Sequence, residues 1–434
     1  MLGLGLTSHI PFVVYIVGWI LAVVALFKNL QIPFMFLALC IPFTNMIARL
    51  EPFWAGKDFV DILLIAVLLG WIMQSARKGE KIMAKTPFNG ILFFHIAFTY
   101  FQLWHGSGFL GLPPPAALND PRFQVWKNYA MLPLLYFMTV NIFKDKRSMR
   151  ILVILMLIAI LIMGMYFFKD YRWISKDTFR DNKRGVGTFK YLGPNEWGAF
   201  HTHFLFIALG LFFVDTSLKI WAIPVGLMIF FSMYSVLFSY SRGAYLAVPF
   251  CLGIFSIMRR KFFIIVLMVV LLLSWKAIVP PAVLERIEGT HDEQGELDKS
   301  SQKRLDLWEQ AMAMFYKNPV SGIGFNTMPY VGLHLGFADT HNLYIKILAE
   351  QGVIGFIIFF VILALAFKQG WKLYNNSEDN FFKGLGLGFF LCVLSMVITN
   401  FFGDRWTYIQ VGAYFWIFLG IVVRANMMVE EKTL

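Results

Sequence analysis

The sequence predicts an all-α, polytopic membrane helical bundle with about 12 or 13 helices crossing a bilayer. Of the 434 residues, 58% are hydrophobic and only 15% are charged, whereas charged residues make up roughly a quarter of an average soluble domain. The apolar residues are also grouped in runs of about 20, the length that a helix needs to cross a membrane. The three cysteines lie inside such runs, far apart, with neither metal-ligand nor disulfide spacing.

Charges, prolines and glycines bound thirteen apolar runs. They cover approximately residues 10–28, 31–50, 58–76, 87–104, 123–143, 148–168, 195–214, 218–239, 243–258, 261–279, 341–368, 381–402 and 406–424. The closely spaced pair 218–239 and 243–258 leaves twelve as an alternative count. We expect the first run to be a retained span, because it has neither a basic segment before it nor a small-residue cleavage site.

Short connections rich in Lys and Arg predict the orientation of the bundle, because such connections stay on the cytoplasmic side. The three basic groups are Arg77, Lys78, Lys81 and Lys85; Lys144, Lys146, Arg147 and Arg150; and Arg259, Arg260 and Lys261. All three fall on one side of the thirteen-span arrangement. The C-terminus should therefore be cytoplasmic and the N-terminus outside.

Two long connections fall on the predicted outer side of a single transmembrane domain, residues 1–434. Residues 169–194 contain seven basic and three acidic residues, a net charge of +4, which favours anions. Residues 280–340 are acid-rich and include an amphipathic segment at about 301–317. Its apolar residues recur at helical spacing and are Leu305, Trp308, Met312 and Phe315. This helix suits either the membrane surface or a position capping the bundle.

The strongest candidate for catalysis is His341, which with Asn342 opens a long apolar run. Asp339 or Thr340 is a plausible N-cap for that helix. A histidine in the first helical turn feels the positive end of the helix dipole, so it should stay neutral and able to act as a general base. The alternative is an interfacial histidine that only makes hydrogen bonds.

The same run contains ionisable and small residues at helical spacing. Lys346 and Glu350 are four residues apart, and charged residues at membrane depth are usually paired or functional. We expect them to form an internal pair that faces the bundle. Gly352 and Gly355 follow and predict a face for close helix packing.

Basic residues at the predicted outer ends of the spans indicate an anion site. Arg242 stands at the junction of two runs, and Lys183 and Arg184 lie in the cationic connection. A guanidinium group offers a planar fork that matches phosphate geometry, although an arginine can also reach out to lipid headgroups. Three further arginines could contribute to the same anion site: Arg122, Arg304 and Arg405.

Several arginines beside a neutral base suit the metal-free displacement of a pyrophosphate leaving group. The arginines would stabilise the developing charge, and the base would take the proton of an acceptor hydroxyl group. The sequence shows no Walker loop, Rossmann glycine pattern or zinc-ligand spacing, so we expect no cofactor. We also expect no nucleic-acid partner.

These motifs resemble the O-antigen ligase and Wzy-type polymerase superfamily of bacterial membrane glycosyltransferases. The ligase pattern is His with Asn, Ser or Gln, then nine residues and Gly-x-x-Gly, as in His341, Asn342, Gly352 and Gly355; Phe356 departs from the usual small or Tyr residue that follows. Four other segments add to the likeness: Arg304-Leu305 with Trp308, residues 318–327, residues 241–244 and residues 187–198.

The resemblance implies a GT-C-type bundle in the bacterial inner membrane, with a lateral cavity and an active site that faces the periplasm. Its donor would be an undecaprenyl-pyrophosphate-linked glycan, and its acceptor the lipid A-core oligosaccharide. His341 would be the catalytic base, with Arg184 and Arg242 on the pyrophosphate. Lys183 and Arg304 would assist binding, and the supporting residues would be Asn342, Asp339, Arg122, Arg405 and Glu350.

Other activities stay open at this point. Wzy-type polymerases and protein O-oligosaccharyltransferases share much of the pattern and differ in the acceptor. A lipid-linked glycan transporter or flippase is a more distant alternative, because it should carry basic residues in both leaflets and paired broken helices in two halves. The histidine motif favours a ligase.

Overall fold

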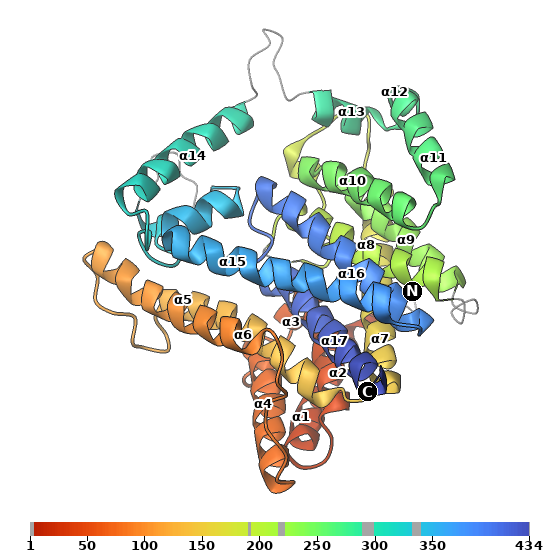
Figure 1. Ribbon diagram of the computed structural model, residues 1–434. Coiled ribbons are helices and arrows are strands. Elements are labelled where there is room, and N and C mark those ends of the chain that lie inside the picture. The colour runs from red at the N-terminus through yellow and green to blue at the C-terminus, as the bar shows by residue number, and fades with distance from the viewer. Residues whose placement is uncertain (1–3, 190–191, 216–221, 289–298, 332–339, 434) are drawn as a thin grey trace.

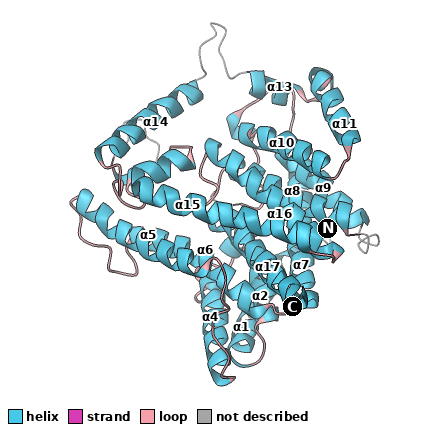
Figure 2. Cartoon of the chain, in the orientation of Figure 1, coloured by secondary structure: helices cyan, strands magenta, loops and turns pink. Residues whose placement is uncertain are grey.

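The computed structural model describes residues 4–189, 192–215, 222–288, 299–331 and 340–433, and none of these residues is in a β-strand (Figure 2). The thirteen predicted spans coincide with helical segments. These are α1 (Leu4–Phe27), α2 (Gln31–Cys40) with α3 (Thr44–Ala48), α4 (Phe59–Arg77), α5 (Asn89–Phe109), α6 (Pro121–Ile142), α7 (Lys146–Tyr171), α8 (Pro194–Val214), α9 (Ala222–Phe238), α10 (Arg242–Met258), α11 (Phe262–Leu273) with α12 (Trp275–Ile278), α15 (Leu343–Asn376), α16 (Asn380–Thr399) and α17 (Ile409–Thr433). Two more helices lie between α12 and α15 in the chain: α13 (Pro281–Glu288) and α14 (Lys299–Lys317) (Figure 1).

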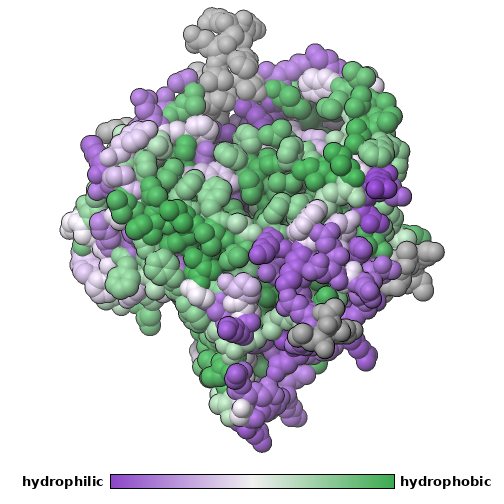
Figure 3. Space-filling model, in the orientation of Figure 1, coloured by the Kyte–Doolittle hydropathy of each residue, from purple (hydrophilic) through white to green (hydrophobic). Residues whose placement is uncertain are grey.

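The predicted class, a polytopic helical membrane protein, is confirmed. Within the described residues, seven helices are long and apolar enough to span a membrane, and four further apolar helices are shorter, from 10 to 17 residues. Hydrophobic side chains form a broad band across one face of the molecule, while hydrophilic ones gather below it, near the C-terminus (Figure 3). The count of 12 or 13 crossings stays a prediction.

The centre of the bundle depends on glycines that let helix backbones approach closely. A Cβ atom on Gly210 of α8 would lie 2.4 Å from the carbonyl oxygen of Gly384 on α16, and one on Gly388 would lie 2.7 Å from the Cα of Ile207. Small residues at helix contacts are the usual means of tight packing in membranes. Helix α16 is therefore held between α8 and α15 (Figure 1).

All three predicted cytoplasmic connections lie at one end of the bundle, here called the basic end. Lys144 contacts Glu80 at 2.6 Å, which joins two of the connections. Arg150 pairs with Asp215 at the end of α8, and Arg259 donates to the Phe213 carbonyl of the same helix. The structure thus confirms that the three basic connections lie at the same end of the bundle. The cytoplasmic location of this end stays a prediction.

The two long connections meet at the opposite end, here called the loop end. The backbone N–H of Ala282 on α13 donates to the Lys176 carbonyl at 3.0 Å, and that of Phe325 donates to the Gln102 carbonyl on α5 at 3.0 Å. Residues far apart in the sequence are therefore joined at this end by backbone hydrogen bonds.

Helix α14 caps the bundle with a face different from the predicted one. Leu307 and Ala311 are fully buried against a cluster that includes Ile323 and Ala349, whereas Leu305, predicted to lie on the apolar face, is 41% exposed. The predicted face was wrong because the apolar surface of α15 and of the turn before it packs against Leu307 and Ala311. These two residues each stand one position before a predicted residue, Trp308 or Met312. Of the two predicted positions for this helix, the structure favours the cap.

Candidate functional site

Helix α15 begins two residues later than predicted, at Leu343, and its N-cap is Asn342. The Asn342 side chain accepts hydrogen bonds from the backbone N–H groups of Tyr344 and Ile345, at 3.0 and 3.3 Å. The expectations that Thr340 caps the helix and that His341 lies in its first turn were wrong. Asparagine is among the strongest N-cap residues because its side-chain oxygen reaches the free N–H groups. Asp339 lies outside the described residues.

His341 occupies a strained corner directly before this cap. Its φ angle is +53°, in the left-handed region, which residues other than glycine adopt rarely and which is often found at functional sites. The Thr340 hydroxyl donates to the Asn342 carbonyl at 2.8 Å, and the Trp308 indole donates to the Thr340 carbonyl at 2.8 Å. These hydrogen bonds hold the backbone on either side of His341, whose side chain is half-buried.

Gly352 breaks helix α15 and does not serve as a helix-packing glycine. Its backbone is non-helical, with φ +63° and ψ −164°, and a Cβ atom there would lie 2.3 Å from the Val320 carbonyl oxygen. The turn at residues 318–324 satisfies the backbone groups that the break releases. Ile323 N–H donates to the Ala349 carbonyl and Gly324 N–H to the Glu350 carbonyl, while Val353 N–H donates to the Pro319 carbonyl.

Lys346 and Glu350 each acquire a partner that the sequence did not reveal. The Lys346 ammonium lies 2.9 Å from Asp404, whose side chain is wholly buried. The buried Glu350 carboxylate accepts backbone hydrogen bonds from Asn326 and Met328, at 3.1 and 3.2 Å. Asp404 follows the predicted span 381–402, and its only signal in the sequence was a charged residue close to a membrane span.

Asp404 is held ionised by its surroundings. Burial raises the pKa of this carboxyl group, but the Lys346 charge and hydrogen bonds from Thr407 and Trp406 outweigh burial and hold the pKa below its ordinary value. The next residue, Arg405, is buried and pairs with Glu196 on α8. The loop between α16 and α17 therefore joins α15 on one side to α8 on the other.

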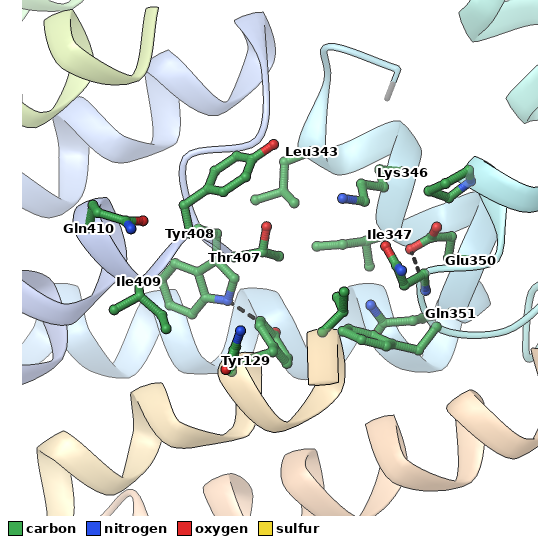
Figure 4. Close-up of a pocket in the computed structure, with 16 residues that line it drawn as sticks. Tyr129, Leu343, Lys346, Ile347, Glu350, Gln351, Thr407, Tyr408, Ile409 and Gln410 are labelled. Carbon is green, nitrogen blue, oxygen red and sulfur yellow. Dashed lines mark hydrogen bonds between the residues drawn. The ribbon is translucent and has the colours of Figure 1, made fainter. Parts of the chain in front are cut away.

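A cavity of about 370 Å³ opens between α6, α15 and this loop (Figure 4). Lys346 and Glu350 lie on one side of it, and Ile409 and Gln410 on the other. The Tyr129 hydroxyl accepts a hydrogen bond from the Trp406 indole at 3.2 Å. The lining combines aromatic rings with amide groups, and it starts within one helical turn of the cap at Asn342.

A cluster of arginine residues lies at the loop end beside α8 and α10. The Arg184 guanidinium donates to the Ser239 carbonyl at 2.9 Å and to Asn195 at 2.7 Å. Arg242 begins α10 three residues after Ser239. The structure therefore brings together the segments of the two arginines predicted to bind pyrophosphate.

Arg286 on α13 joins this cluster, and the sequence analysis had missed it. Burial and the nearby charge of Arg286 lower the pKa of Arg184 to about 10, so Arg184 stays charged at neutral pH. Arg286 stacks on Phe179, with its guanidinium carbon 4.8 Å from the ring centre. Its position depends on the docking of α13 onto the cationic connection, which no local pattern indicates.

The remaining predicted basic residues have other surroundings. Arg122 contacts Asp120 at 2.8 Å and Ser107 at 2.9 Å, and thus fastens the start of α6 to the end of α5. Arg304 is half-buried on α14, and Lys183 lies next to Arg184 in the cationic connection. In the part of the chain that the structure describes, no three His, Cys, Asp or Glu side chains are grouped as a metal site would require.

The fold and this site together define a polytopic membrane protein with a half-buried histidine, a cluster of arginine residues and a cavity lined by aromatic and amide side chains at one end. Residues 227–360 match the family model described as O-antigen ligase, a segment that contains Arg242, Arg304 and His341. No curated protein matches the chain. The match covers 134 of the 434 residues and shows that this segment is similar to the O-antigen ligase family, in agreement with the resemblance that the motifs indicated.

Proposed function

We propose that this protein is a membrane glycosyltransferase that moves a glycan from undecaprenyl pyrophosphate to a hydroxyl group of lipid A-core oligosaccharide. The reaction takes place at the loop end, which we assign to the periplasmic face of the inner membrane. One observation carries the proposal: His341 is fixed at a strained corner beside the polar cavity, inside the segment that matches the O-antigen ligase family.

In the proposed reaction, His341 acts as general base. It takes the proton of the acceptor hydroxyl group while the acceptor oxygen bonds to the anomeric carbon of the donor sugar. The bond between that carbon and the phosphate oxygen breaks, the configuration inverts, and undecaprenyl pyrophosphate leaves. The protonated imidazole then returns its proton to water. General base catalysis of this kind contributes roughly 10²–10⁴-fold to the rate.

The arginine cluster supplies the second part of the proposed mechanism. Arg184 and Arg242 would bind the two phosphate groups, with Arg286 close to them, and would stabilise the negative charge that develops on the leaving group. The buried position of Arg184 supports this role, because a fixed cation shielded from water interacts more strongly with an anion.

The test is a substitution of His341 that keeps the backbone geometry. Asparagine tolerates the left-handed conformation and cannot act as a base, so His341→Asn should insert and fold normally. Attachment of long glycan to the acceptor, seen on gels of envelope glycolipid, should fall at least about 10²-fold. Exposed His9 on α1 provides the matched control, and His9→Ala should keep full activity. Normal glycan attachment in His341→Asn would overturn the proposal.

The same cells distinguish the acceptor. If the acceptor is lipid A-core oligosaccharide, His341→Asn cells should accumulate long glycans still attached to undecaprenyl pyrophosphate. Accumulation of single repeat units would instead indicate a polymerase, in which the acceptor is another glycan. Long carrier-linked chains with normal lipopolysaccharide and an unglycosylated protein would indicate a protein O-oligosaccharyltransferase.

A further inference from the structure

A second cavity adjoins the one beside α15. It has a volume of about 440 Å³ and reaches toward α3 and α4. Asn128, Ile409 and Gln410 line both cavities, so the two are adjacent and share a wall. Each lies within the range of roughly 300–1,000 Å³ that is typical of ligand pockets. Two adjacent cavities of this size suit a chain of linked units better than one small molecule.

The lining of this space suits sugar residues. The first cavity is lined by four aromatic residues, Tyr129, Phe325, Trp406 and Tyr408, and by the amide side chains of Gln351 and Gln410, among others. Aromatic rings pack against the apolar C–H faces of sugars, and each amide group both donates and accepts hydrogen bonds, as sugar hydroxyl groups do. A lipid tail would leave such polar groups without hydrogen bonds, which is unfavourable.

The charged groups that line the first cavity have partners within the protein. Lys346 is paired with Asp404, and the Glu350 carboxylate accepts two backbone hydrogen bonds. In the second cavity, Lys127 lies 2.5 Å from Asp61, and the other charged lining residues are Glu51, Lys57 and Asp58. Since this lining has three carboxylates and two ammonium groups, it gives no net attraction for a free anion, and the two cavities together favour an uncharged polar ligand.

The position of the space connects it to the histidine. Five residues of α15 line the first cavity: Leu343, Lys346, Ile347, Glu350 and Gln351. Their spacing of three and four residues places them on one face of the helix, and this face begins two residues after His341. A polymer lying in the space would therefore run away from the corner that holds the imidazole group.

We propose that the two cavities form one groove that binds consecutive sugar residues of a glycan substrate, a role that rests on the proposed glycosyl transfer. The sugars belong either to the glycan of the donor or to the oligosaccharide of the acceptor. Asn128 and Gln410, at the junction of the two cavities, contact the sugar that spans both parts of the groove.

The experiment measures binding of two soluble oligosaccharides to the full-length protein in lipid nanodiscs by saturation-transfer NMR. One probe is the long glycan released from undecaprenyl pyrophosphate by mild acid, and the other is the core oligosaccharide released from lipid A in the same way. The wild-type protein should bind one of them, and the one that binds identifies the source of the sugars.

Loss of two junction amides should weaken this binding. The double substitution Asn128→Ala and Gln410→Ala removes half-buried side chains, and with each hydrogen bond contributing about 1 kcal/mol the Kd should rise about 10- to 30-fold. Gln302, an exposed amide on α14, supplies the matched control, and Gln302→Ala should bind as the wild type does. Unchanged binding in the double variant, or no binding of either probe to the wild type, would overturn the groove.

The two proposals can fail separately. His341→Asn should bind the oligosaccharide as tightly as the wild type, because the imidazole group acts on the reacting hydroxyl. If that variant still transfers glycan while the junction variant loses binding, the base mechanism is wrong and the groove stands. If His341→Asn is inactive and the junction variant binds normally, the groove is wrong and the base mechanism stands.

Discussion

Asp404 joins α15 to the loop before α17 through the two oxygens of one carboxylate. One oxygen contacts Lys346 of α15 at 2.9 Å and accepts from the Thr407 hydroxyl at 2.5 Å. The other accepts backbone hydrogen bonds from Trp406 and Thr407. Because Trp406 and Lys346 both line the first cavity, this single buried residue sets the shape of its wall.

Asp404→Asn should destabilise the protein at neutral pH, because it removes the fully buried carboxylate that pairs with the partly buried Lys346 ammonium. Removing one partner of a buried pair costs about 3–5 kcal/mol, and thermal unfolding in detergent micelles measures the effect. The control is Glu80→Gln in the exposed pair with Lys144, which should change the melting temperature little. An unchanged melting temperature in Asp404→Asn would show that the pair does not stabilise the fold.

The pH dependence of unfolding supplies a further check on the same variant. The pKa of Asp404 is lower in the folded protein than its ordinary value, which is about 3.9. Its contribution to stability is therefore complete above about pH 4 and is lost as the pH falls through the folded value. The difference in melting temperature between the wild type and Asp404→Asn should shrink below pH 4. A constant difference down to pH 2 would contradict the pKa assignment.

At the scale of secondary-structure elements, the break in α15 organises the loop end. At Gly352 the helix is broken, and the turn at residues 318–324 packs against the break. The same turn and Phe325 after it contact Gln102 and Gly106 of α5. Because α14 ends directly before the turn, the break also positions Trp308 over the residues before α15. Backbone geometry thus explains the first glycine, Gly352, of the Gly-x-x-Gly part of the histidine motif.

Gly352→Ala should therefore impair both stability and activity. An alanine would have to adopt a φ of +63° with its Cβ atom 2.3 Å from a backbone oxygen, and strained positions of this kind cost about 1–3 kcal/mol. Thermal unfolding and glycan attachment measure the two effects. Gly253 of α10 has open space around it, so Gly253→Ala serves as the control and should be neutral or slightly stabilising. Equal behaviour of the two variants would argue against the break.

At the scale of the whole molecule, the two ends of the bundle differ in chemistry. Basic short connections gather at one end, and the long connections, the arginine cluster and both cavities at the other. The bundle is wide, with α1 and α4 on one flank and α10 and α11 on another (Figure 1). In the proposed orientation, the loop end faces the periplasm.

Labelling with a membrane-impermeant maleimide tests this orientation. The three native cysteines are buried, so they should give little background. Thr178→Cys at the loop end should react in intact spheroplasts, whereas Glu378→Cys at the basic end, between α15 and α16, should react only after permeabilisation. Both positions are exposed, so each controls for the other. The reverse pattern would place the loop end in the cytoplasm.

The positions of the helices were predictable, because long apolar runs in a membrane protein have few alternatives to a helix. The ends of the helices were less predictable. The cap of α15 is Asn342 and not the expected Thr340, because the choice of cap depends on side-chain geometry, which composition does not show. The buried face of α14 was missed for a related reason, since Leu307 rather than Leu305 meets the surface that α15 offers.

By itself, the sequence determined the membrane class, the clustering of basic connections at one end, and the histidine motif that resembles the O-antigen ligase superfamily. These are properties of local composition and spacing, so they do not depend on how the helices pack against one another. Only the tertiary structure decided that Asp404 is the partner of Lys346, that Arg286 joins Arg184, and that two cavities share a wall at Asn128 and Gln410. Each of these depends on contacts between segments far apart in the chain, which no local pattern encodes.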